Sequence, residues 1–379
     1  MWAFALSRFR EVSEPGWTGS RRLQVTPRRT SCRCRPGSGG DSLSGAVDGG
    51  RHMRRREFIR LLGGVAATWP IAALAEQPAM PVVGFLGPGS AETDTYRVTA
   101  FEQGLREAGL VVGRNVRIEY RWAQSRYDQL PALAAELVEA RVAVIATSGT
   151  PAALAAKAST TTIPIVFETA ADPVQIGLVT SLNRPGGNVT GITQSSDVTT
   201  PKRLELLHEL LPGARAMVLL VNPAAPVLAE PQSRNVRSAA QTMGLELHVL
   251  NASTETELEA AFPKLLELQA SGLVIAGDAF FTSRSKKLAA LAAQYKVPAV
   301  YQWREFAASG GLMSYGSNVT ETHRLVGIYT ARILKGDKPA DLPVQQATNV
   351  ELYINLKTAK ALGISVPLPL SGRADELFE

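Results

Sequence analysis

From Glu76 onward, short apolar runs alternate strictly with helical patterns, and this alternation is the feature that most restricts the fold. Residues 82–86 read as a buried strand, and the helix after them carries Val98, Phe101 and Leu105 on one face. Strands and helices in strict alternation indicate a parallel sheet with helices on both faces. We therefore predict an α/β fold.

The pattern occurs twice along the chain. A first set of strands and helices ends near Ile192, and a second set starts near Pro201. Thr254 and Glu257 have the spacing of a capping box and predict a helix start in the second set. We expect two similar α/β domains, each with a Rossmann-like parallel sheet.

The residues after the second set are too few for a third domain and are expected to complete the first two. We predict a first lobe of residues 76–195 plus about 312–345, and a second lobe of residues 196–311 plus about 346–379. This arrangement requires several chain crossings between the lobes. Such a multi-strand hinge is suited to closure around a ligand.

Residues 53–75 have the parts of an export signal. Residues 54–60 place paired arginines ahead of Phe58, which is typical of the twin-arginine type. The apolar run at residues 61–72 is too short to span a bilayer. We expect cleavage after Ala75 and release of a chain that begins at Glu76 in the periplasm.

Residues 1–52 are expected to be disordered, and we interpret them as an upstream extension that is absent if translation starts at Met53. Of 40 Lys and Arg and 34 acidic residues in the chain, 13 and five precede Glu76. Residues 76–379 therefore hold 27 basic and 29 acidic residues, and this balance argues against a nucleic-acid partner. Both cysteines, Cys32 and Cys34, also precede Glu76, so no disulfide or cysteine metal site is expected after it.

Polar loops follow several predicted strands, at the edge where parallel sheets bind ligands. The candidate ligand-binding residues are Ser90, Ser148, Gly149, Thr150, Thr169, Asp172, Asn222, Asp278, Phe280, Tyr301 and Tyr315. The helix start at residues 147–151 suits a carboxylate, although Ser148 and Thr150 could instead only cap that helix.

The other candidates also have two readings. Asp278 could pair with an ammonium group, whereas Asp172, before Pro173, is equally expected in a turn. The aromatic side chains could contact an apolar ligand group or belong to the core. The glycines at residues 87–89 do not follow the order of a dinucleotide-binding loop, so no nucleotide cofactor is expected.

No pattern of a catalytic or metal site was found in the sequence. His208, His248 and His323 each stand alone, and neither an H-E-x-x-H nor a G-x-S-x-G motif occurs. We expect no enzyme activity, no metal and no cofactor.

Several sequence blocks resemble one known family along nearly all of residues 53–379. These blocks include residues 81–86, 127–134, 147–153, 182–191, 202–207, 221–223, 311–316 and 354–363. They are similar to the ABC-transporter substrate-binding family whose characterised members take tryptophan or tyrosine. The resemblance implies a type I periplasmic-binding-protein fold, a ligand in the cleft between two lobes, and delivery to a membrane permease.

The ligand implied is an amino acid or a related small organic acid, which could be aromatic, and the protein is expected to be a monomer. A ligand-sensing protein that feeds a membrane receptor is the alternative, because the same fold serves both purposes.

Overall fold

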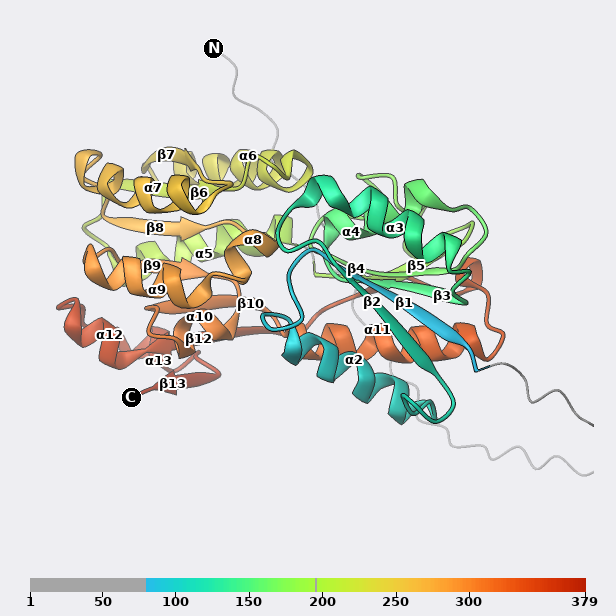
Figure 1. Ribbon diagram of the computed structural model, residues 1–379. Coiled ribbons are helices and arrows are strands. Elements are labelled where there is room, and N and C mark those ends of the chain that lie inside the picture. Colours follow the sequence, from blue (N-terminus) through green and yellow to red (C-terminus); the bar gives the residue numbers. More distant parts are fainter. Residues whose placement is uncertain (1–79, 195) are drawn as a thin grey trace, which may run out of the picture. The chain divides into compact units, whose positions relative to one another are not determined.

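The computed structural model describes residues 80–379 except residue 195. The expected disordered extension, export signal and cleavage site lie outside the described residues. Residues 76–379 form one compact unit, in which the described strands make two sheets. We call the two sheets with their covering helices the first and second lobes (Figure 1).

The first lobe contains a parallel sheet with helices on both faces. Its strands, in spatial order, are β11 (Gln345–Gln346), β5 (Val189–Thr193), β4 (Ile165–Thr169), β3 (Val144–Thr147), β1 (Val82–Gly87) and β2 (Arg117–Trp122). Its helices are α2 (Thr95–Glu107), α3 (Leu130–Glu139), α4 (Thr150–Ser159) and α11 (Val319–Leu334), with short 3-10 turns η1 (Tyr127–Gln129) and η2 (Pro339–Asp341). Figure 1 shows α2 and α11 on one face and α3 and α4 on the other.

The second lobe has the same layering. Its strands, in spatial order, are β13 (Glu376–Phe378), β12 (Val350–Asn355), β10 (Met313–Ser317), β9 (Ala299–Tyr301), β8 (Gly272–Ile275), β6 (Ala216–Val221) and β7 (Glu246–Asn251). One face packs against α5 (Ser196–Leu210), α6 (Pro226–Thr242), α12 (Leu356–Ala361) and α13 (Leu368–Ser371). The other packs against α7 (Glu255–Glu267), α8 (Ala279–Thr282), α9 (Ser285–Gln294) and α10 (Arg304–Ala308). All neighbouring pairs are parallel except β10 and β12.

The chain passes between the lobes three times within residues 80–379. It crosses between β5 and α5, between β10 and α11, and between β11 and β12. The prediction that residues 312–317 belong to the first lobe is wrong, because β10 pairs with β9 and β12 in the second sheet. A short apolar strand pattern indicates burial, but it does not indicate which sheet the strand joins.

The capping box predicted for α7 is present, with one difference. The Thr254 hydroxyl accepts a hydrogen bond from the Glu257 amide at 3.2 Å. The Glu257 carboxylate returns to the amide of Ser253, one residue before the expected partner, at 2.7 Å. Both bonds satisfy amides at a helix start that would otherwise lack acceptors.

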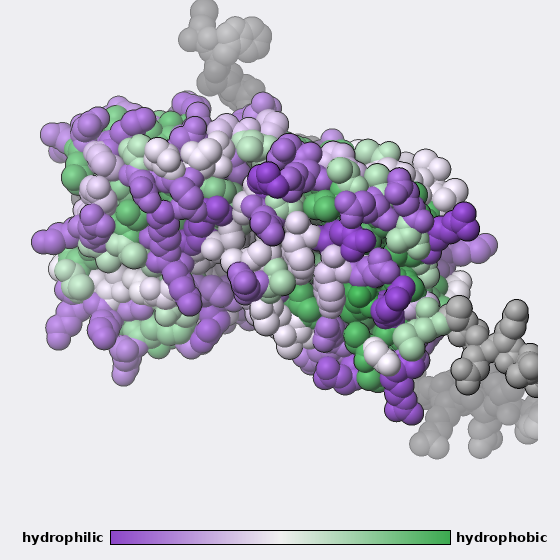
Figure 2. Space-filling view, viewed as in Figure 1, coloured by the Kyte–Doolittle hydropathy of each residue, from purple (hydrophilic) through white to green (hydrophobic). Residues whose placement is uncertain are grey.

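Figure 2 shows hydrophilic and hydrophobic residues interspersed over the visible face. Within residues 80–379, no helix has both the length and the hydrophobicity needed to cross a bilayer.

Two glycines allow α2 and α11 to cross at close range. A Cβ at Gly104 would overlap the carbonyl oxygen of Arg324, and one at Gly327 would overlap that of Phe101. Because both obstacles are backbone atoms, they cannot rotate away as a flexible side chain can.

We expect Gly327→Ala to lower the free energy of unfolding by about 1–3 kcal/mol, since the added methyl group must push two helices apart. Urea unfolding at equilibrium measures this change. Gly213→Ala is the matched control, because a Cβ there would meet nothing within 4 Å. Equal stability of the two variants would contradict the close packing of α2 against α11.

Candidate functional site

A small cavity lies at the carboxyl ends of strands from both sheets, where the topology predicts a ligand. Its volume is about 20 Å³, which is room for about one water molecule. It is lined by Arg97, Gly149, Thr150, Pro151, Glu168 and Ala170 of the first lobe and by Leu228, Gly277, Asp278, Ala279 and Trp303 of the second. Of the predicted ligand-binding residues, Gly149, Thr150 and Asp278 therefore lie at this cavity.

Asp278 presents one carboxylate oxygen without a hydrogen-bond partner. The residue follows β8, caps the short helix α8, and is only 3% exposed. Its Oδ1 accepts hydrogen bonds from the Tyr127 hydroxyl, the Asn222 side-chain amide and the Phe280 backbone amide, at 2.8–2.9 Å. Its Oδ2 is buried and has no partner among the described residues. Burial raises the pKa of this carboxyl, and the hydrogen bonds from its neutral donors offset only part of that rise.

Hydrogen bonds join the two lobes around Asp278. The Tyr127 hydroxyl of the first lobe donates to Asp278 and accepts from the Phe280 amide, each at 2.9 Å. Nearby, Arg284 Nη1 donates to the Ser125 hydroxyl at 3.2 Å. The residues that face the cavity from the second lobe are thus held by the first lobe as well.

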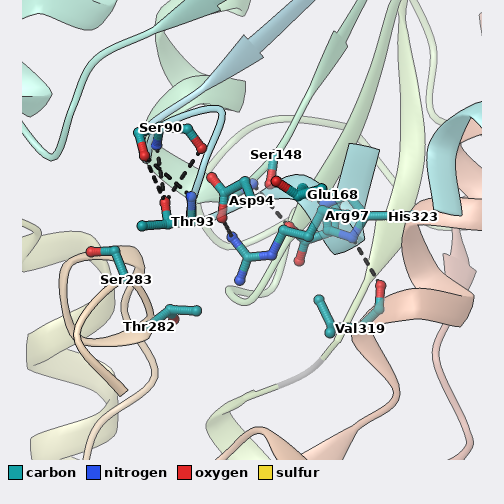
Figure 3. Close-up of polar contacts among 12 residues, drawn as sticks. Ser90, Thr93, Asp94, Arg97, Ser148, Glu168, Thr282, Ser283, Val319 and His323 are labelled. Carbon is teal, nitrogen blue, oxygen red and sulfur yellow. Dashed lines mark hydrogen bonds and ion pairs between the residues drawn. The ribbon is translucent and has the colours of Figure 1, made fainter. Parts of the chain in front are cut away.

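Arg97 of α2 is the positively charged residue of the cavity lining and is 4% exposed. Its Nη1 pairs with Asp94 Oδ1 at 3.0 Å, as Figure 3 shows. Its guanidinium lies 5.3 Å from the ring centroid of Trp303 in the second lobe. Its Nε is buried without a partner among the described residues, so Arg97 keeps one free donor.

The start of α4 is occupied by a carboxylate of the protein itself. The backbone amide of Gly149 donates to Glu168 Oε2 at 2.9 Å. The alternative that Ser148 and Thr150 cap this helix is wrong, because their hydroxyls bond to other partners. The Thr150 hydroxyl instead pairs with that of Thr169 at 2.7 Å, and Ser148 pairs with His323 at 3.0 Å.

The pair of Ser148 and His323 resembles a nucleophile and its base, but both side chains are fully buried, away from a substrate. His323 Nδ1 lies 2.9 Å from the Val319 carbonyl oxygen, which only accepts, so Nδ1 carries the proton and Nε2 accepts from Ser148. Burial lowers the pKa of His323 to about 3, so the ring stays neutral. Both side chains are fully buried, and they fix the loop before α4.

Four further predicted residues do not line the small cavity. Asn222 donates a hydrogen bond to the side chain of Asp278, and the Tyr301 hydroxyl donates one to its backbone carbonyl oxygen. Phe280 is buried beneath the guanidinium of Arg284. Ser90 lines a separate polar cavity of about 450 Å³.

Two predicted residues have structural roles away from the cavity. Asp172 accepts from the Val174 and Gln175 amides, as its alternative reading as a turn residue predicts. Tyr315 lies in β10, where its side chain packs against the core of the second lobe. Neither lines the small cavity.

Arg97, Glu168 and Trp303 line the cavity but were not among the predicted ligand-binding residues. A signal for Arg97 existed, because it is four residues before Phe101 and so lies on the apolar face of its helix. A charged residue on such a face indicates a buried polar site. Glu168 is likewise a charged residue at the end of an otherwise apolar strand.

A larger cavity of about 630 Å³ lies in the second lobe between α6 and the edge of the sheet. Its charged lining residues, Glu230, Arg234 and Arg237, are exposed. None of its lining side chains is a buried polar group without a partner. We therefore place the candidate site at the smaller cavity, where such groups gather.

The fold and this site define a two-lobed ligand-binding protein. The sequence model of the family described as ABC transporter substrate binding protein matches residues 90–378. The chain belongs to this family. Its members are substrate-binding proteins that bind small ligands and generally work outside the cytoplasm, and they are not enzymes.

Individual relatives agree with this assignment. A tyrosine-binding protein of Clostridioides difficile is 29% identical over 262 residues, which is 69% of this chain and 75% of the relative. The ABC domain of Streptococcus pneumonia in complex with L-Trp has a TM-score of 0.72 at 22% identity, covering 79% of this chain and 99% of that one.

A periplasmic binding protein/LacI transcriptional regulator of Alkaliphilus metalliredigens, complexed with D-xylulofuranose, has a TM-score of 0.50 at 11% identity. The match covers 72% of this chain and 96% of that one. The predicted type I periplasmic-binding-protein fold is confirmed.

Proposed function

We propose that this chain is the solute-binding component of an ABC importer and binds an amino acid or a related small organic acid, aromatic ones included, between its two lobes. It would act as a monomer in the periplasm, deliver its ligand to an ABC permease, and lose its export signal after Ala75. Relatives that bind tyrosine or L-Trp support the ligand class. The pattern of residues 53–75 supports the location.

The observation that carries this proposal is the free Oδ2 atom of Asp278. A buried carboxylate oxygen without a partner is costly, so it indicates a group that arrives from outside. An ammonium group supplies both the positive charge and the hydrogen bonds that Asp278 lacks. Arg97 Nε, on the opposite lobe, offers a donor for the ligand's acceptor.

Ligand entry requires the lobes to separate. Small-molecule sites usually measure about 300–1,000 Å³, whereas this cavity has about 20 Å³. Three chain crossings provide a hinge, and the hydrogen bonds of Tyr127 and Ser125 must break as it opens.

A thermal-shift screen of the protein against the amino acids tests the ligand class. A ligand at 100 times its dissociation constant should stabilise the fold by about 2.7 kcal/mol, which appears as a rise in Tm. Titration calorimetry then gives the Kd, and loss of uptake of that ligand by cells without this protein tests the importer role. If no amino acid shifts the Tm at millimolar concentration, the proposal of an amino-acid ligand is wrong.

A further inference from the structure

Two groups of the cavity that suit a ligand carboxylate, the Gly149 amide and Arg97 Nη1, are already engaged by carboxylates of the protein. The Gly149 amide at the start of α4 donates to Glu168, and Arg97 Nη1 pairs with Asp94. Figure 3 shows Asp94 and Glu168 close to Arg97. An incoming carboxylate would therefore find these two positions occupied.

The same groups leave the cavity with an excess of negative charge. Asp94, Glu168 and Asp278 are each at most 5% exposed, and Arg97 is the single basic residue that lines the cavity or contacts its lining carboxylates within the described range. Burial is the largest cause of the raised pKa of all three carboxyls, and Arg97 lowers the pKa of Asp94 and Glu168. A second anion would be repelled by the ionised carboxylates, whereas a cation would pair with them.

Asp278 is the carboxylate that lacks a positively charged partner. Arg97 pairs directly with Asp94 and also acts electrostatically on Glu168. Asp278, in contrast, receives hydrogen bonds only from neutral groups, and its Oδ2 receives none from the described residues. The charge that the site lacks is thus a cation next to Asp278.

We propose that this site selects its ligand by a primary ammonium group and that the ligand's carboxylate contributes little to affinity. This inference rests on the proposed function and shifts its ligand class from amino acids and related organic acids to amino acids and primary amines with the same side chain. Amino acids still fit, because Arg97 Nε can donate one hydrogen bond to their carboxylate. Organic acids without an amino group do not fit.

Titration calorimetry with matched compounds tests the proposal. One series is L-tyrosine, tyramine and 3-(4-hydroxyphenyl)propionate, and the other is L-tryptophan, tryptamine and indole-3-propionate. We expect each amine to bind within about tenfold of its amino acid, and each acid to bind at least about 100-fold more weakly.

An amine more than tenfold weaker than its amino acid, or an acid less than 100-fold weaker, would overturn the inference while the proposed function stands. Binding by none of the six compounds would instead contradict the proposed function for aromatic ligands, and the inference would fall with it.

Glu168→Gln gives a second test, in which the preference for amine over acid is compared between the variant and the wild-type protein. It removes one of the excess negative charges, while the side-chain amide oxygen of glutamine can still accept from the Gly149 amide. We expect the preference for amine over acid to fall at least about tenfold. Glu136→Gln, which neutralises an exposed carboxylate paired with Arg121, is the control and should leave that preference unchanged. An unchanged preference in Glu168→Gln would also overturn the inference.

Discussion

Asp278→Asn should weaken ligand binding by about 100-fold, because the ligand's ammonium group loses its buried counter-ion. The substitution keeps the size of the side chain and an oxygen that can accept from Tyr127, Asn222 and the Phe280 amide. The fold should therefore survive. Titration calorimetry measures the Kd, and thermal unfolding checks stability in the same sample.

The control for this variant is Asp337→Asn. It removes a carboxylate that is 44% exposed and paired with Arg332 on the surface, so we expect no change in affinity. If Asp278→Asn binds the ligand as tightly as Asp337→Asn does, Asp278 is not the ammonium partner.

Arg203→Leu should lower the free energy of unfolding by about 3–5 kcal/mol, the largest loss of stability that we expect from a single substitution. Arg203 is fully buried in α5, and burial lowers the pKa of its guanidinium to about 9, so it remains charged at neutral pH. It donates four hydrogen bonds, to the carbonyl oxygens of Tyr315 and Ile275 and to the side chains of Thr199 and Gln302.

Leucine would leave those four acceptors without their donor, at about 1–3 kcal/mol each where they stay buried. Removal of a buried charge offsets part of this cost, and so the expected net loss is smaller than the sum. Denaturant unfolding measures it.

Lys202→Met is the neighbouring control, because Lys202 is 42% exposed and pairs with Glu205 at the surface. It should change stability by less than about 1 kcal/mol. A loss of similarly small size in Arg203→Leu would show that the hydrogen bonds of Arg203 do not stabilise the second lobe.

The adjacent pair Lys202 and Arg203 shows a difference in burial that could not be predicted from the sequence. Two consecutive basic residues within one helix look alike in the sequence, and both would ordinarily be solvated. Arg203 is buried because α5 packs on β8 and β10, whose carbonyl oxygens lie within its reach. These acceptors come from residues about 70 and 110 positions later in the chain, so no local pattern could indicate them.

The candidate site could likewise be predicted only in part. The loops that line the cavity could be predicted, because apolar strands in a parallel sheet place their carboxyl ends at one edge, and Gly149, Thr150 and Asp278 follow such strands. The partners of these residues could not be predicted. Tyr127 donates a hydrogen bond to Asp278, which lies 151 positions later in the chain. Ser148 is hydrogen-bonded to His323, which lies 175 positions later.

The sequence by itself determined the two-lobed α/β architecture and the edge of each sheet that carries the candidate site, because hydrophobic periodicity is a local property of the chain. Its sequence blocks also resemble the family to which the chain belongs. Only the tertiary structure decided that β10 lies in the second sheet and that Glu168 and Asp94 occupy the groups suited to a carboxylate. It also decided that Asp278 Oδ2 remains free. Sheet membership and charge balance depend on which distant residues meet, and that is set by packing rather than by any short pattern.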